Sequence, residues 1–283
     1  MNWDIQEVKS KMLELSSPNP EVEAIIQLLE DGVSDLKLIG QKVRLDPILS
    51  ARLLQLANSS FYGFSREVKD AEMACVILGA NTVRNLIYTL VVMARFNHSV
   101  LESGLDYTRI WHHSLMTACF AQVLSKQLKL DAQVGFTAGL FNNLGIVLMD
   151  YFYPGQIRQS LDIALKEQRN LLEVEEAVMG KNHQSLTGVV LDLWSFPETI
   201  ISSITGACED DALPALVVTL ANILATATTR PVVPGIPIFQ AQPWQAEPVG
   251  ADLTVLPEVI VQAHHLYHEL ADAFFPKASE VQA

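Results

Sequence analysis

The stretch Gly139-Leu140-Phe141-Asn142-Asn143-Leu144-Gly145 places two adjacent amide side chains in an otherwise apolar run. No charged residue lies between Asp131 and Asp150, so this part of the chain is apolar enough to be buried in a core. Burying an amide side chain costs free energy unless the amide is hydrogen-bonded. The stretch therefore predicts a core helix in which both amides face inward and have polar partners.

The sequence around this stretch has the periodicity of amphipathic helices almost throughout. Between Val83 and Ala94, for example, apolar residues recur at intervals of three and four, which places them on one face of a helix. No segment has a strand pattern, so the predicted fold class is all-α. The expected helices span approximately 3–15, 21–30, 35–44, 47–57, 71–78, 81–96, 107–128, 131–153, 155–169, 172–179, 184–195, 197–206, 212–228 and 258–274.

Local signals mark several of the helix boundaries. Asp46-Pro47 is a capping side chain followed by proline at the first helical position. Asn58 lies in a turn-forming cluster and is expected to end that helix. Gly79 is expected to end the helix that Asp70 begins. The helix that Asp131 caps is expected to break near Gly145 and to resume as far as Tyr153.

The polar stretch 97–106 suggests a boundary between two subdomains, residues 1–105 and 106–283. The first part has 10 Lys and Arg against 13 Asp and Glu, and the second has 9 against 19. The formal net charge of −13 is thus concentrated in the second part. Nucleic acids and anionic membranes are not expected as partners, because binding phosphate groups needs clustered basic side chains.

The composition, 49% hydrophobic and 18% charged, is that of a folded protein. The N-terminus has no signal-peptide pattern, and the uncharged run 212–229 is polar enough to favour a core helix over a membrane span. Cys75, Cys119 and Cys208 are far apart and lie in apolar contexts, which indicates buried thiols in a reducing compartment. We therefore expect a cytoplasmic protein.

Residues 231–257 differ from the rest of the chain. They contain six prolines and no lysine or arginine, and a loop of this length is unusual inside a compact domain. Phe239 and Trp244 are candidates for contact with a partner protein.

Several of these motifs, taken in order, resemble the HDOD domain. The resemblance covers approximately residues 10–228 and implies two helical subdomains, the second similar to the HD family of metal-dependent phosphohydrolases. HDOD domains are bacterial regulatory and signalling modules, often without detectable catalysis. The positions that carry the resemblance include Asp46, Pro47, Asn58, Gly79, Trp111, Gly139, Gly145, His183 and Trp194.

The HD enzymes hold metal with a first His, a His-Asp pair and a distant Asp. By resemblance, these ligands correspond to His113, the pair Asn142-Asn143, and Asn222. Neutral amides are poor replacements for imidazole and carboxylate ligands, so we expect neither a metal nor another cofactor. The four residues could instead form a hydrogen-bonded remnant that holds helices together, or they could line a ligand pocket.

The remaining histidines have plain interpretations. His112 is expected to face away from His113, and His183 is expected to cap or precede the helix of about 184–195. His264 and His268 have a spacing of four residues that can bind metal, but they lack an evident third ligand.

Three functions remain open from the sequence. The first is a non-catalytic regulatory module that acts by protein–protein interaction, without nucleic acid or membrane. The second is a residual metal-dependent phosphohydrolase or phosphodiesterase. The third is a nucleotide sensor that binds without turnover.

Overall fold

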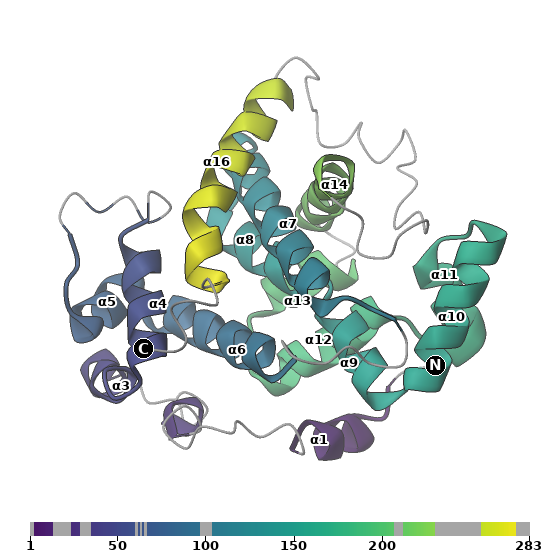
Figure 1. The fold of residues 1–283 in the computed structure, drawn as a ribbon, viewed down its shortest axis with the longest axis horizontal. Coiled ribbons are helices and arrows are strands. Elements are labelled where there is room, and N and C mark those ends of the chain that lie inside the picture. Colours follow the sequence, from purple (N-terminus) through teal and green to yellow (C-terminus); the bar gives the residue numbers. More distant parts are fainter. Residues whose placement is uncertain are drawn as a thin grey trace. The chain divides into compact units, whose positions relative to one another are not determined.

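The computed structural model describes residues 3–13, 24–28, 35–59, 62, 64, 67–96, 104–206, 212–229 and 256–275. All regular structure in these ranges is helical, which confirms the predicted all-α class (Figure 1). The chain divides into two compact units. The large unit is Met1–Glu14 with Phe96–His264, and the small unit is Leu15–Arg95 with His265–Ala283.

The large unit is organised around one long buried helix, α7. Every residue of α7 from His113 to Ser125 is buried, and helices α8 and α14 pack along it. Its helices are α1 (Ile5–Leu13), α7 (Tyr107–Gln127), α8 (Ala132–Phe141), α9 (Leu144–Phe152), α10 (Pro154–Glu167), α11 (Leu171–Met179), α12 (His183–Leu193), α13 (Glu198–Thr205) and α14 (Leu213–Thr228).

The small unit contains a second group of helices, in which α5 packs against both α3 and α4. Its elements are α3 (Leu36–Val43), α4 (Pro47–Ala57), α5 (Ala71–Leu78) and most of α6 (Ala80–Phe96). The last helix, α16 (Leu256–Phe274), belongs to the large unit as far as His264 and to the small unit from His265 onward.

The observed units differ from the predicted subdomains at both chain ends. Residues 1–14 group with the large unit, because Trp3 and Val8 are buried there and α1 packs against α12. The second half of α16 groups with the small unit. Most of the predicted proline-rich loop, including Phe239 and Trp244, lies outside the described residues. Its last position, Pro257, instead belongs to the first turn of α16.

The capping residues behave as their sequence predicts. The Asp46 carboxylate accepts a hydrogen bond from Leu49 N at 2.9 Å and so caps α4. Asn58 ends that helix and also joins it to Val68. Its Nδ2 donates to Val68 O at 2.8 Å, while its Oδ1 accepts from Val68 N at 2.7 Å. Gly79 ends α5 with a φ of 80°, a conformation that glycine adopts without steric cost.

The predicted helix break near Gly145 is present, but Gly145 itself does not form it. The helix that Asp131 caps breaks at Asn142 and Asn143, and Gly145 lies inside α9. The reason is that Gly145 serves close packing: a Cβ at this position would overlap the carbonyl oxygen of His183 and lie 2.8 Å from Thr187 Oγ1. The absence of a side chain therefore lets α9 approach α12.

The cysteines and the apolar stretch around the two asparagines were both predicted to be buried. Cys75 and Cys119 are buried free thiols, as expected, and burial raises the pKa of Cys75 to about 12. Cys208 lies outside the described residues. Helices α8 and α9 together form an apolar stretch, Ala132–Phe152, long enough to cross a membrane, but most of it is buried within the protein, as in the core of a folded domain.

The glycine contact between α9 and α12 gives a prediction about stability. Gly145→Ala should lower the free energy of unfolding by about 2 kcal/mol or more, because the added methyl group meets backbone atoms that cannot rotate away. Urea denaturation measures the change.

Gly155→Ala is the matched control, because a Cβ at that position in α10 meets no atom within 4 Å. This substitution should leave stability unchanged or raise it by up to ~1 kcal/mol. Equal effects of the two substitutions would contradict the close packing at Gly145.

Candidate functional site

Two of the four candidate site residues form a buried hydrogen bond. His113 lies on α7 and Asn222 on α14, and His113 Nε2 is 2.7 Å from Asn222 Oδ1. Both side chains are almost completely inaccessible to solvent, with 1% and 2% of their surface exposed. The contact therefore links α7 to α14 in the core of the large unit.

The protonation of His113 follows from its surroundings. Burial lowers the pKa of the imidazole below 6.5, and the hydrogen bond to Asn222 only partly opposes this shift. A neutral imidazole facing an amide oxygen carries its hydrogen on Nε2 and donates it. The lone pair is then on Nδ1, which is buried and has no hydrogen-bond partner among the described residues.

Asn143 lies beside the same helix but makes a different contact. Its Nδ2 is 3.4 Å from Ser114 Oγ, and its Oδ1 is buried without a hydrogen-bond partner in the described part of the chain. Asn142, 3% exposed, ends α8. No hydrogen bond between described residues joins either asparagine to His113 or Asn222. The structure thus brings together His113 and Asn222, and it places Asn143 at the neighbouring Ser114.

A second buried polar cluster links α9, α11 and α12. Gly145 N donates to Thr187 Oγ1 at 2.9 Å, and that hydroxyl donates to His183 O at 3.0 Å. The Glu175 carboxylate accepts from His183 N at 2.9 Å and lies 2.7 Å from His183 Nδ1. Glu175 has no exposed surface, so these bonds replace its contact with water.

This cluster corrects the interpretation of His183 and adds a residue that the sequence analysis missed. Asn182 caps α12 by accepting from Ser185 N at 2.9 Å, whereas His183 is the first helical residue and pairs with Glu175. The sequence feature that could have indicated a buried Glu175 is its place in the apolar stripe of its helix. It lies next to Val174 and four residues after Leu171.

A third buried pair also escaped the sequence analysis. Tyr107 Oη donates to Asp150 Oδ2 at 2.7 Å, which ties the start of α7 to the end of α9. Burial, followed by the bond to Asp150, raises the pKa of the Tyr107 phenol, so the phenol keeps its proton at neutral pH. Asp150 could have been noticed because it ends the long uncharged run that contains the two asparagines.

The sequence matches the HDOD domain family over residues 15–208, more than half of the chain. This chain belongs to the HDOD family. The predicted resemblance is thereby confirmed. Comparison with curated proteins gives no match.

Solved structures share the fold. A candidate phosphohydrolase from Shewanella amazonensis is 23% identical, with a TM-score of 0.68 over 94% of this chain and 97% of that one. An HDOD domain protein of unknown function from Geobacter sulfurreducens is 19% identical, with a TM-score of 0.63 over 96% and 98%. A candidate signal transduction protein from Marinobacter aquaeolei is 21% identical, with a TM-score of 0.61; the match covers 93% of this chain and 59% of that protein. Identities this low show the fold alone.

The donor set of this HDOD domain does not fit a divalent metal. Amides are weak neutral ligands, and the Nε2–H group of His113 is already donated to Asn222. Among the described residues, no cluster of three or more His, Cys, Asp or Glu side chains could hold a metal ion.

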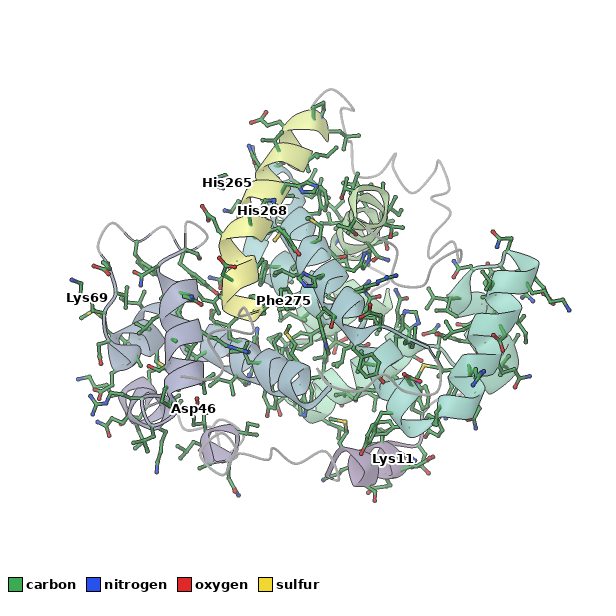
Figure 2. All side chains as sticks on the ribbon, in the orientation of Figure 1. Lys11, Asp46, Lys69, His265, His268 and Phe275 are labelled. Carbon is green, nitrogen blue, oxygen red and sulfur yellow. The ribbon has the colours of Figure 1, made fainter. Side chains whose placement is uncertain are left out.

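The histidines of α16 make other contacts. Figure 2 labels His265 and His268 on this helix, and His265 Nδ1 is 3.3 Å from Glu269 Oε1. His264, one of the two histidines whose spacing suits a metal, packs edge-on against the ring of Phe120.

Other HDOD motif positions have structural roles. Gly139 lets α8 contact α7, because a Cβ there would lie 2.7 Å from Ala118 Cα. Trp111 is 2% exposed in the core. Trp194 contacts Phe196, and Phe196 packs edge-on against Phe141 at a centroid distance of 5.3 Å.

The buried imidazole predicts how stability depends on pH. Because the pKa of His113 is lowered on folding, the unfolded chain binds a proton that the folded chain excludes once the pH falls below about 6.5. The free energy of unfolding should therefore be highest above this pH. It should fall on acidification, by up to ~1.4 kcal/mol per pH unit from this group. His113→Asn should flatten that slope in urea titrations between about pH 7 and pH 5.

His112→Asn is the control. His112 is only half-buried, and burial lowers its pKa against the opposing effect of Asp106, so it should account for a smaller part of the slope. An unchanged slope in His113→Asn would mean that His113 is charged in the folded protein, contrary to the neutral form assigned above.

Proposed function

We propose that this HDOD protein is a non-catalytic regulatory module, which acts by protein–protein interaction in a bacterial signalling pathway. The observation that carries the proposal is the bond between His113 and Asn222. In the HD enzymes the corresponding positions hold metal through an imidazole and a carboxylate. In this chain the same two helices are joined by a neutral hydrogen bond.

The chemistry of the site supports this proposal. A metal-bound hydroxide requires a cation whose charge is balanced by anionic or imidazole ligands. Asn142, Asn143 and Asn222 bring no negative charge, and burial keeps His113 neutral. An amide has nearly the shape of a carboxylate, so these residues can preserve helix packing without the metal chemistry.

The setting of the fold also favours regulation. The Marinobacter protein that shares this fold is named as a candidate in signal transduction, and this analogy extends to the fold and no further. The acidic net charge of −13 argues against nucleic acid as the partner. The proposed partner is therefore another protein.

Two alternatives rest on specific observations. The Shewanella protein of the same fold is named as a candidate phosphohydrolase, so residual turnover is the first alternative. The second is nucleotide binding without turnover. It is favoured by the buried acceptors His113 Nδ1 and Asn143 Oδ1, which could receive hydrogen bonds from a ligand.

Metal analysis separates regulation from residual hydrolysis. The purified chain, dialysed after exposure to excess Mn²⁺, should retain far less than one ion per molecule and should not cleave a phosphodiester substrate. The variant with Asn142→His, Asn143→Asp and Asn222→Asp restores the HD ligand types and should retain more Mn²⁺. Stoichiometric Mn²⁺ in the wild-type chain, lost in His113→Ala, would overturn the proposal.

Thermal unfolding with nucleotides tests the sensing alternative. A ligand present at 100 times its dissociation constant stabilises the folded state by about 2.7 kcal/mol, which raises Tm by several degrees. The regulatory proposal expects no shift at millimolar mono-, di- or cyclic nucleotides. A shift that is lost in Asn143→Ala would instead favour the sensor.

A further inference from the structure

Helix α1 is held on the large unit by a tryptophan at its N-terminal edge. Trp3 is 4% exposed, and its Nε1 donates to Ser185 Oγ at 2.9 Å. Lys181 Nζ lies 4.0 Å from the centre of the Trp3 ring, which is within the range of a cation–π contact. Trp3 also packs against Tyr153, with ring centroids 5.6 Å apart.

The rest of α1 adds polar contacts to the same surface. Tyr153 Oη donates to Glu7 Oε1 at 2.7 Å. Lys11, labelled on α1 in Figure 2, places its Nζ 4.9 Å from the centre of the Tyr153 ring. Val8, which lies between Glu7 and Lys11 in the sequence, is fully buried. Helix α1 therefore meets the large unit through a repeating pattern: Trp3, then Glu7 and Val8, then Lys11.

The helix and the surface that receives it differ in their relation to the HDOD match. The HDOD match begins at residue 15, so α1 lies outside it, whereas Tyr153, Lys181 and Ser185 lie inside. The HDOD part of the chain thus presents a receptor surface, defined by Tyr153, Lys181 and Ser185, to a helix from outside the family segment. We call it the α1 surface.

The interaction has the character of a reversible contact. Helix α1 has nine residues, and isolated helices of this length are marginal in water, so it depends on the α1 surface to stay helical. Only Trp3 and Val8 of its described side chains are buried, while Ile5 is 50% exposed. The contact of α1 with this surface therefore depends on few side chains, and a helix that carries the same anchors can compete for the same surface.

We infer that the α1 surface is a docking site for an amphipathic helix of a partner protein, and that α1 occupies it in cis. The partner helix has the chemistry that α1 displays: a tryptophan, an acidic residue four positions later, an aliphatic residue five positions later and a basic residue eight positions later. The inference rests on the proposed function, because it names the surface through which the regulatory module contacts its partner.

A labelled peptide tests the docking site in the full-length chain. The probe is the segment Met1–Glu14 carrying a fluorophore, and binding is measured by anisotropy. In the wild-type chain the probe competes with tethered α1, whose effective concentration is of millimolar order. Trp3→Ala loosens α1, so that this variant should bind the probe about tenfold more tightly than the wild-type chain does.

Matched variants locate the probe on the surface. Adding Lys181→Ala to Trp3→Ala should weaken binding several-fold, because the cation over the tryptophan ring is lost. Adding Lys166→Ala, an exposed lysine on α10, should change nothing. A probe that itself carries Trp3→Ala should not bind. Should Trp3→Ala fail to fold, Glu7→Ala serves instead, since it loosens α1 by removing only an exposed contact with Tyr153.

Three outcomes would overturn the inference: no binding of the probe to a folded loosened variant at millimolar concentration, equal binding by wild-type and loosened chains, or equal loss with Lys166→Ala and Lys181→Ala. A wild-type dimer that requires Trp3 would also overturn it, because a second copy would then supply the helix. These results are independent of metal content and turnover. A chain that binds the probe and also retains Mn²⁺ would overturn the proposed function while keeping the docking site.

Discussion

The backbone contact between α7 and α8 at Gly139 is the constraint on which the large unit depends. Position 139 does not accommodate a side chain, because a Cβ there would lie only 2.7 Å from Ala118 Cα. With α8 held this close to α7, the chain breaks at Asn142 and Asn143 and continues as α9. Gly145 then brings α9 close to α12. Two glycines, six residues apart, thus set the spacing of four helices.

Tight spacing explains the kind of polar groups that the core contains. Each buried polar pair joins two helices: His113 with Asn222, Tyr107 with Asp150, and His183 with Glu175. In a closely packed interior a directional bond fixes the rotation of a helix about its axis, which apolar contacts do less precisely. Amides in such a core suit this role, because they keep hydrogen-bonding geometry without bringing charge into the core.

Sequence reasoning succeeded where the signal is local. Asp46 with Pro47, Asn58 and Gly79 mark helix ends through bonds to neighbouring backbone, and these contacts are as expected. It failed where the cause lies far along the chain. From the sequence alone Gly145 is expected to break a helix, and only its contact with His183 shows that it allows close packing. Likewise, Trp3 reads as part of an N-terminal subdomain until its bond to Ser185, 182 residues away, is known. The pairing of His113 with Asn222 was expected only through family resemblance, and no spacing rule predicts it.

The limits of the sequence family and of the folding unit do not coincide. The HDOD match ends at residue 208, and α14 begins at Leu213. A fragment cut at the family boundary would keep His113 but lose Asn222, together with the apolar face of α14 that covers α7. Its central helix would then expose a buried imidazole and a strip of core side chains to water. Such a fragment would be expected to aggregate, and its behaviour would say little about the intact protein.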